Sequence, residues 1–391
     1  MICHEEFCVY ARDYGVKLQQ RAVVPTVLAG APHLDPDRIF DIAKAAEVCP
    51  FEVSLELLRH VTAVVCDYNY VFDPAIALGG LADEASLEDT YLVIDEAHNL
   101  LDRAREYHSP RLGLRGIEAA RALIDGRRAK VCCDLVDVLG EVAELIRTTV
   151  SVAVANRTAC AEQALPLASL TALRLAFDAL IPDYFTYKRN AQLWLAEDPV
   201  IRVLLDLARL VDVLEDGGRE FVTLAERTGG ATADEVIRVF CLDASRFTGQ
   251  VLDRCTGAIA MSATMEPFEF HRDLLGFDPD RTDTLALPSP FPPENRLIIA
   301  VDEVDTSFRE RDRHWGRIAE LIAELAPVGR NALALFPSYA FLRQVSDRLV
   351  APGHVIEVQR GDFSDAARAD LFRRLAGRRE PMLLLAVLGG A

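Results

Sequence analysis

Residues 91–100 read YLVIDEAHNL, in which four apolar residues run directly into Asp95, Glu96, Ala97 and His98. The continuous apolar run predicts a short strand that is buried on both faces. A surface turn after such a strand more often contains Gly, Asn or Pro, and burying unpaired carboxylates carries a large free-energy cost. The two adjacent carboxylates therefore predict contact with water or with a bound cation at the end of this strand.

The composition narrows the class of protein before any other motif is considered. The chain has 391 residues, is 51% hydrophobic and carries a net charge of −18, which predicts two or three domains and limits any nucleic-acid binding to a groove. Nine cysteines fit reduced thiols or metal ligands. With no signal peptide and no bilayer-spanning apolar stretch, we expect a cytoplasmic protein, nucleoid-associated if bacterial, with no membrane partner.

A second apolar strand is expected within GAIAMSATMEP (257–267), and it ends in the hydroxyl residues Ser262 and Thr264. After a proline-rich linker at 288–296, apolar segments alternate with helical patterns, which predicts parallel sheets of an α/β fold. Further strands are expected at 61–66, 296–302, 331–339, 354–359 and 381–390.

The middle of the sequence has a different pattern. Between about 105 and 235, apolar residues recur at helical spacing and no segment reads convincingly as a strand. One helix is expected to begin at Pro199 with Asp198 as its N-cap. This region is therefore expected to be a helical insertion.

The two strand ends define a candidate site. In an open α/β sheet, ligands bind beyond the carboxyl ends of the strands, so neighbouring strands would place all these polar groups in one crevice. An Asp there can hold Mg²⁺, and an adjacent Glu can orient or deprotonate a water that attacks a γ-phosphate. The alternative is a polar turn without function; a zinc protease would need a second His on the same helical face.

The segments YLVIDEAHNL and AIAMSAT resemble motifs II and III of superfamily 2 helicases. The flanking segments narrow this resemblance to the iron–sulfur DNA helicases of the XPD-like and DinG-like group. These flanks are VCPFEVS (48–54), DYNYVFDP (67–74), SPFPPENR (289–296) and LALFPSY (333–339).

The resemblance spans essentially the whole chain and implies two RecA-like motor domains, with an iron–sulfur domain and a helical Arch domain inserted in the first. It also implies ATP-dependent, 5′→3′ unwinding of DNA in repair or replication, with ATP and Mg²⁺ as cofactors and single-stranded and forked DNA as partner. Protein partners are not indicated. The boundaries that it implies are 1–50 for a partial iron–sulfur domain, 51–104 and 241–290 for the first motor domain, 105–240 for the Arch-like insertion and 291–391 for a partial second motor domain.

By the same resemblance, Asp95 takes the Mg²⁺ role and Glu96 the water-activating role. The residues implied to couple nucleotide and movement are His98, Ser262 and Thr264. FPSY (336–339) resembles a motif near the DNA backbone, which makes Ser338 and Tyr339 candidate nucleic-acid contacts, together with Tyr70 near the proposed cluster domain.

The family holds a 4Fe–4S cluster with four cysteines, and the resemblance assigns Cys3, Cys8 and Cys49 to it. The family's first cysteine would precede residue 1, and His4 or Cys66 could substitute for it. A zinc site that uses His4, or three unrelated thiols, are the alternatives.

The sequence departs from the family at one important place, because it contains no G-x-x-x-x-G-K-S/T loop to hold phosphates. It also stops before the family's last motifs, which include an arginine finger. We therefore expect an internal portion of a longer helicase that is inactive by itself. The alternatives are a non-catalytic DNA-binding or scaffold protein of the same fold and an RNA-directed DEAH ATPase; the helical insertion and the Cys-Pro-Phe flank argue against the second.

Overall fold

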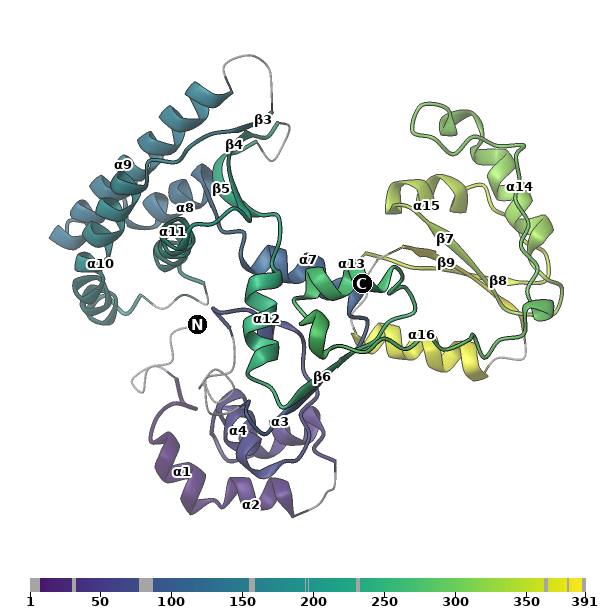
Figure 1. Ribbon diagram of the computed structural model, residues 1–391, viewed down its shortest axis with the longest axis horizontal. Coiled ribbons are helices and arrows are strands. Elements are labelled where there is room, and N and C mark those ends of the chain that lie inside the picture. The colour runs from purple at the N-terminus through teal and green to yellow at the C-terminus, as the bar shows by residue number, and fades with distance from the viewer. Residues whose placement is uncertain are drawn as a thin grey trace. The chain divides into compact units, whose positions relative to one another are not determined.

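A computed structural model describes residues 8–29, 33–76, 87–154, 159–193, 195, 197–229, 233–361, 365–377 and 380–388. The chain divides into two compact units, Met1–Leu285 and Ala286–Ala391, and each unit is described by itself (Figure 1). Within the described ranges, no helix combines the length and apolarity needed to cross a membrane.

The first unit begins with a small helical domain. Its helices are α1 (Tyr14–Gln20), α2 (Val23–Leu28), α3 (Pro36–Ala45) and α4 (Pro50–Leu57). Val23, Val27 and Val53 form the centre of its apolar core. Helix α3 begins where its sequence predicts, because the Asp35 carboxylate accepts a hydrogen bond of 3.0 Å from the backbone N–H of Asp37.

The strand expected at 61–66 is absent: this segment is irregular, and both Val64 and Val65 are exposed. β-branched residues favour a strand where a partner strand and a half-buried surface exist, and no described strand pairs with this segment. A short helix, α5 (Asn69–Phe72), follows it.

Strands β1 (Tyr91–Ile94) and β6 (Gly257–Ala260) pair in parallel, with Ile94 opposite Ala260. Side chains from α7 (His98–Tyr107), α12 (Ser245–Asp253) and α13 (Phe268–Leu275) complete the apolar core on one face of this pair.

The expectation that β1 is buried on both faces is wrong. Val93 is 64% exposed and its register neighbour Ile259 is 63% exposed, whereas Ile94 is buried. Alternate residues of a strand point to opposite faces, and the packed helices cover only the face that carries Ile94.

The middle region contains the expected helices, α8 (Leu114–Ile124), α9 (Lys130–Ala153), α10 (Leu167–Asn190) and α11 (Pro199–Asp216). The N-cap prediction is confirmed: Asp198 accepts a hydrogen bond of 2.9 Å from the backbone N–H of Val200. Asp198 also forms a buried ion pair with Lys188, whose side chain is 1% exposed.

The expectation of no strands between 105 and 235 is wrong. A four-stranded antiparallel sheet has the order β2-β5-β4-β3, and α9 packs against β4 and β5. Two of its strands are only three residues long, too short to show a period in the sequence. The strands are β2 (Arg111–Gly113), β3 (Cys160–Glu162), β4 (Phe221–Arg227) and β5 (Glu235–Cys241).

The second unit contains a parallel sheet of order β7-β9-β8. Its strands are β7 (Ala332–Phe336), β8 (Val355–Val358) and β9 (Met382–Val387), which confirms three predicted strands. Its helices are α14 (Trp315–Leu325), α15 (Tyr339–Ser346) and α16 (Asp365–Gly377). Short 3-10 helices among the described residues span Leu58–His60, Pro279–Arg281, Pro293–Asn295 and Arg311–Arg313.

The strand expected at 296–302 is absent, and Leu297 and Ile298 are 83% and 76% exposed. Apolar residues alone do not make a strand when no neighbouring strand takes up the backbone hydrogen bonds. The parallel sheets of both units nevertheless confirm the predicted α/β class.

Candidate functional site

The candidate site lies at the carboxyl edge of the β1–β6 pair. The backbone N–H of Met261 donates to the carbonyl of Ile94 at 2.9 Å, and the N–H of Ala97 donates to the carbonyl of Met261 at 3.0 Å. The pairing therefore continues one residue beyond both strands. It places the turn at 95–98 beside the turn at 262–264, as expected if the two strands are neighbours.

Four polar side chains form a connected cluster at this edge. The Ser262 hydroxyl lies at its centre, 2.7 Å from His98 Nδ1 and 3.4 Å from Glu96 Oε2. His98 Nδ1 is also 3.4 Å from Glu96 Oε2. Thr264 joins through its hydroxyl, 3.3 Å from Ser262 Oγ, and through its backbone N–H, which donates to the same oxygen at 3.2 Å.

The backbone at the start of this turn is strained. Glu96 has a φ of 45°, in the left-handed region that non-glycine residues rarely occupy. The N–H of Glu96 donates to Asp95 Oδ1 at 2.9 Å, which holds the first carboxylate against the turn. Both carboxylates are exposed. They reach water without leaving the strand end, so charge at this position carries no burial penalty and leaves both groups open to a cation.

The Tyr68 hydroxyl stabilises the turn by hydrogen bonding, a role that the sequence does not reveal. This hydroxyl donates to the carbonyl oxygens of Asp95 and Glu96, the second at 3.0 Å. The pKa of Tyr68 is raised, first by burial and then by the nearby charges of Asp95 and Glu96. A protonated hydroxyl is needed to donate these bonds, and the raised pKa extends the protonated form to higher pH. The one sequence signal is its position in the DYNYVFDP flank.

The structure brings together the segments of two of the three assigned cysteines. Cys8 and Cys49 are partly exposed free thiols. The Lys17 ammonium donates to the carbonyl of Val9 at 2.7 Å and to that of Glu47 at 3.2 Å. The same side chain therefore contacts the backbone beside Cys8 and the backbone shortly before Cys49.

Cys3 lies outside the described residues. Among the described ones, no group of three or more His, Cys, Asp or Glu is arranged to hold a metal.

Of the candidate nucleic-acid residues, Ser338 and Tyr339 belong to the second unit and Tyr70 to the first. Ser338 is the N-cap of α15 and accepts a hydrogen bond of 3.2 Å from the N–H of Phe341. The Tyr339 hydroxyl is buried and has no hydrogen-bond partner among the described residues. Tyr70 is half-buried.

Comparisons with known proteins agree on one group. Residues 3–116 match the DEAD_2 family model. The chain is 21% identical over 349 residues to ATP-dependent DNA helicase chl1 of Neosartorya fischeri, with 78% of this chain and 38% of that protein covered. It is 25% identical over 350 residues to ATP-dependent DNA helicase DinG of Photobacterium profundum, with 77% and 50% covered.

A solved structure of S. tokodaii Xpd4 aligns with 82% of this chain and 62% of that chain, at 18% identity and a TM-score of 0.46. Over residues 3–116 the chain is similar to the DEAD_2 family. It is related to the XPD-like and DinG-like helicases of superfamily 2, which confirms the resemblance. It spans half or less of the length of the two helicases compared above.

The Tyr68 contact generates a testable prediction. In Tyr68→Phe, the carbonyls of Asp95 and Glu96 lose their shared donor, and the free energy of unfolding is expected to fall by about 1 kcal/mol. Chemical denaturation measures this change. Tyr70→Phe is the matched control, because its hydroxyl makes no hydrogen bond to a described residue; equal losses in both variants would contradict the supporting role.

Proposed function

We propose that this chain forms part of an ATP-dependent DNA helicase whose hydrolytic edge is the β1–β6 pair. Asp95 would hold the Mg²⁺ of bound ATP, and Glu96 would orient and deprotonate the attacking water. The observation that carries this proposal is the joining of the Asp95–Glu96 turn to the Ser262–Thr264 turn by continued strand pairing. A strained, exposed carboxylate pair on a rigid strand is suited to a metal-bound phosphate.

The side-chain cluster supports a coupling role for His98, Ser262 and Thr264. Glu96 touches Ser262, and Ser262 in turn holds His98 and the backbone of Thr264. A change in the charge around Glu96, such as loss of a γ-phosphate, would therefore alter hydrogen bonds on a loop that is distant in sequence. This is the physical requirement for turning hydrolysis into movement.

The remaining parts of the chain receive roles within the same proposal. Residues 51–104 and 241–290 would form the first RecA-like motor domain and 291–391 part of the second. Residues 105–240 would form an Arch-like insertion and 1–50 part of an iron–sulfur domain. The substrate would be single-stranded and forked DNA, unwound 5′→3′ in repair or replication, with Ser338, Tyr339 and Tyr70 as candidate contacts.

Without a G-x-x-x-x-G-K-S/T loop in its sequence, the isolated chain lacks the groups that cradle the phosphates of ATP. It is therefore proposed to be inactive on its own. A non-catalytic DNA-binding remnant and an RNA-directed ATPase are the competing functions, and both are separated from the main proposal by turnover measurements.

Glu96→Gln tests the hydrolytic assignment. The purified chain is expected to show no DNA-stimulated ATP hydrolysis above the level of this variant. In a longer polypeptide in which a phosphate-binding loop precedes residue 1, turnover is expected with single-stranded DNA, and Glu96→Gln should lower it by about 100-fold or more because general-base assistance is lost.

Glu141→Gln is the matched control, since Glu141 is an exposed carboxylate on α9 and lies outside the cluster. Turnover by the isolated chain that Glu96→Gln abolishes would contradict the proposed inactivity. Unchanged turnover of the longer Glu96→Gln variant would contradict the role of Glu96, and stimulation by RNA alone would favour the RNA-directed function.

The 4Fe–4S cluster, proposed with Cys3, Cys8 and Cys49 as ligands, has its own test. Anaerobically purified protein is expected to be brown and to absorb near 400 nm, as an approximate value for thiolate-bound iron–sulfur centres. Cys49→Ser should lose iron, whereas Cys133→Ser, an exposed cysteine on α9, should keep it. Colourless protein with stoichiometric zinc would contradict the cluster and favour a zinc site.

A further inference from the structure

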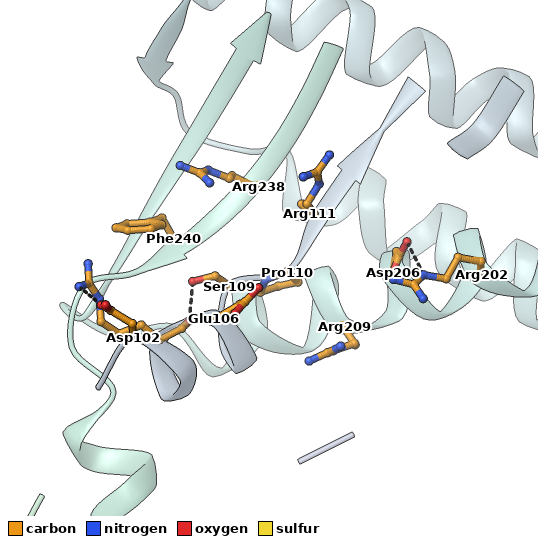
Figure 2. A pocket seen from close by; sticks show the side chains of 11 residues that line it. Asp102, Glu106, Ser109, Pro110, Arg111, Arg202, Asp206, Arg209, Arg238 and Phe240 are labelled. Atoms are coloured by element: carbon orange, nitrogen blue, oxygen red, sulfur yellow. Dashed lines mark hydrogen bonds and ion pairs between the residues drawn. The ribbon is translucent and has the colours of Figure 1, made fainter. Parts of the chain in front are cut away.

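A pocket of about 440 Å³ lies within the first unit, away from the carboxylate edge, and draws its lining from α7, β2, α11 and β5 (Figure 2). It is rich in arginine although the chain as a whole is strongly acidic. The arginines outnumber the carboxylates that line it. The arginines are Arg105, Arg111, Arg202, Arg209 and Arg238, and the carboxylates are Asp102, Glu106 and Asp206.

Three of these arginines are held by carboxylates or by backbone carbonyls. Arg202 Nε lies 3.3 Å from the Asp206 carboxylate, and Arg209 donates to the carbonyl of Tyr107 at 2.9 Å. Arg105 donates to a backbone carbonyl of β5 at 3.2 Å. These contacts fix the guanidinium groups around the pocket and leave part of their hydrogen-bonding capacity unused, since each carries five N–H donors.

Arg111 is different, because its exposed side chain makes no ion pair or hydrogen bond to any described residue. It lies directly opposite Arg238 across the β2–β5 pair, and Figure 2 shows the two side chains on these neighbouring strands. Like charges directly opposite each other destabilise a sheet. Arg238 is partly compensated by Glu226, 2.8 Å away, whereas Arg111 is attracted electrostatically by Asp206 without forming an ion pair with it. A bound anion would relieve this repulsion.

The aromatic ring of Phe240 orients two of the guanidinium groups. Arg105 and Arg238 lie over Phe240, at 5.2 Å and 5.0 Å from its centroid. Cation–π contacts of this kind restrict the side chains before any ligand arrives, which lowers the entropy lost on binding.

The spacing of the charges indicates the size of the ligand. Arg202 and Arg209 are seven residues apart on α11, which corresponds to about 10 Å along the helix axis. Together with the other three arginines of the lining they make five guanidinium groups, more than the oxygens of one phosphate can each engage in a bidentate pair. Guanidinium groups match the oxygens of phosphate in a bidentate manner, so several linked phosphates fit this arrangement best.

We propose that this pocket binds linked phosphate groups, carried either by a single nucleic-acid strand or by a free polyphosphate. In its strand form the inference rests on the proposed function, and it adds a defined anchoring point in the first unit. Because the chain as a whole carries a net charge of −18, binding would be local and would involve a short stretch of the strand.

Fluorescence anisotropy with a labelled oligothymidine tests the proposal on the 391-residue chain without ATP. Arg111→Gln is expected to weaken binding about tenfold, the effect of removing one charge-assisted contact, and to reduce the salt dependence by about one phosphate contact. Arg147→Gln is the matched control on α9, where Arg147 lies 3.6 Å from Glu118, and it should leave binding unchanged.

Competition identifies the source of the phosphates. Displacement of the oligonucleotide by inorganic tripolyphosphate at equal phosphate concentration would assign the pocket to free polyphosphate, and resistance to it would assign the pocket to a strand. Equal affinities of Arg111→Gln and Arg147→Gln, absence of binding, or equally strong displacement by polyglutamate would each overturn the proposal. Since no hydrolysis is measured, such a failure would leave the role of Glu96 untouched.

Discussion

The parallel pairing of β1 with β6 is the constraint on which the candidate site depends. Two backbone hydrogen bonds beyond the strands, through Met261, fix the relative height of two turns that are far apart in the sequence. Every polar contact at the edge follows from that register. If the register shifted by one residue, the side chains at each strand end would move to the other face, and Ser262 would no longer lie between Glu96 and His98.

Carboxylates and arginines are concentrated at two different candidate binding sites of the first unit. The carboxylates at the β1–β6 edge are exposed and tied to a strained turn. The arginines of the first-unit pocket come from separate elements and are oriented by carbonyls, by carboxylates and by Phe240. Against a net charge of −18 for the whole chain, five arginines around one pocket are a local exception to the acidic balance.

The sequence predicted the features that local chemistry controls. Strand ends followed by polar residues, as at Ile94 and Met261, and the Asp198 N-cap could be recognised directly. Prediction from the sequence failed where pairing with residues distant in the chain decides whether a strand forms. The segments 61–66 and 296–302 have strand-like composition without a partner strand, whereas β2 and β3 are too short to show a pattern and exist through their partners. The support from Tyr68 and the opposition of Arg111 and Arg238 likewise arise only from the fold.

The most direct test of the account is a double-mutant cycle on the hydrogen bond between His98 and Ser262, which joins the two strand ends at 2.7 Å. The free energy of unfolding would be measured for His98→Ala, for Ser262→Ala and for the double variant. If the two turns form one site, the effects should be non-additive by about 0.5 kcal/mol or more, as found for residues in contact. Additivity within about 0.3 kcal/mol would show that these two side chains do not interact, and the polar cluster proposed to couple the two turns would not stand.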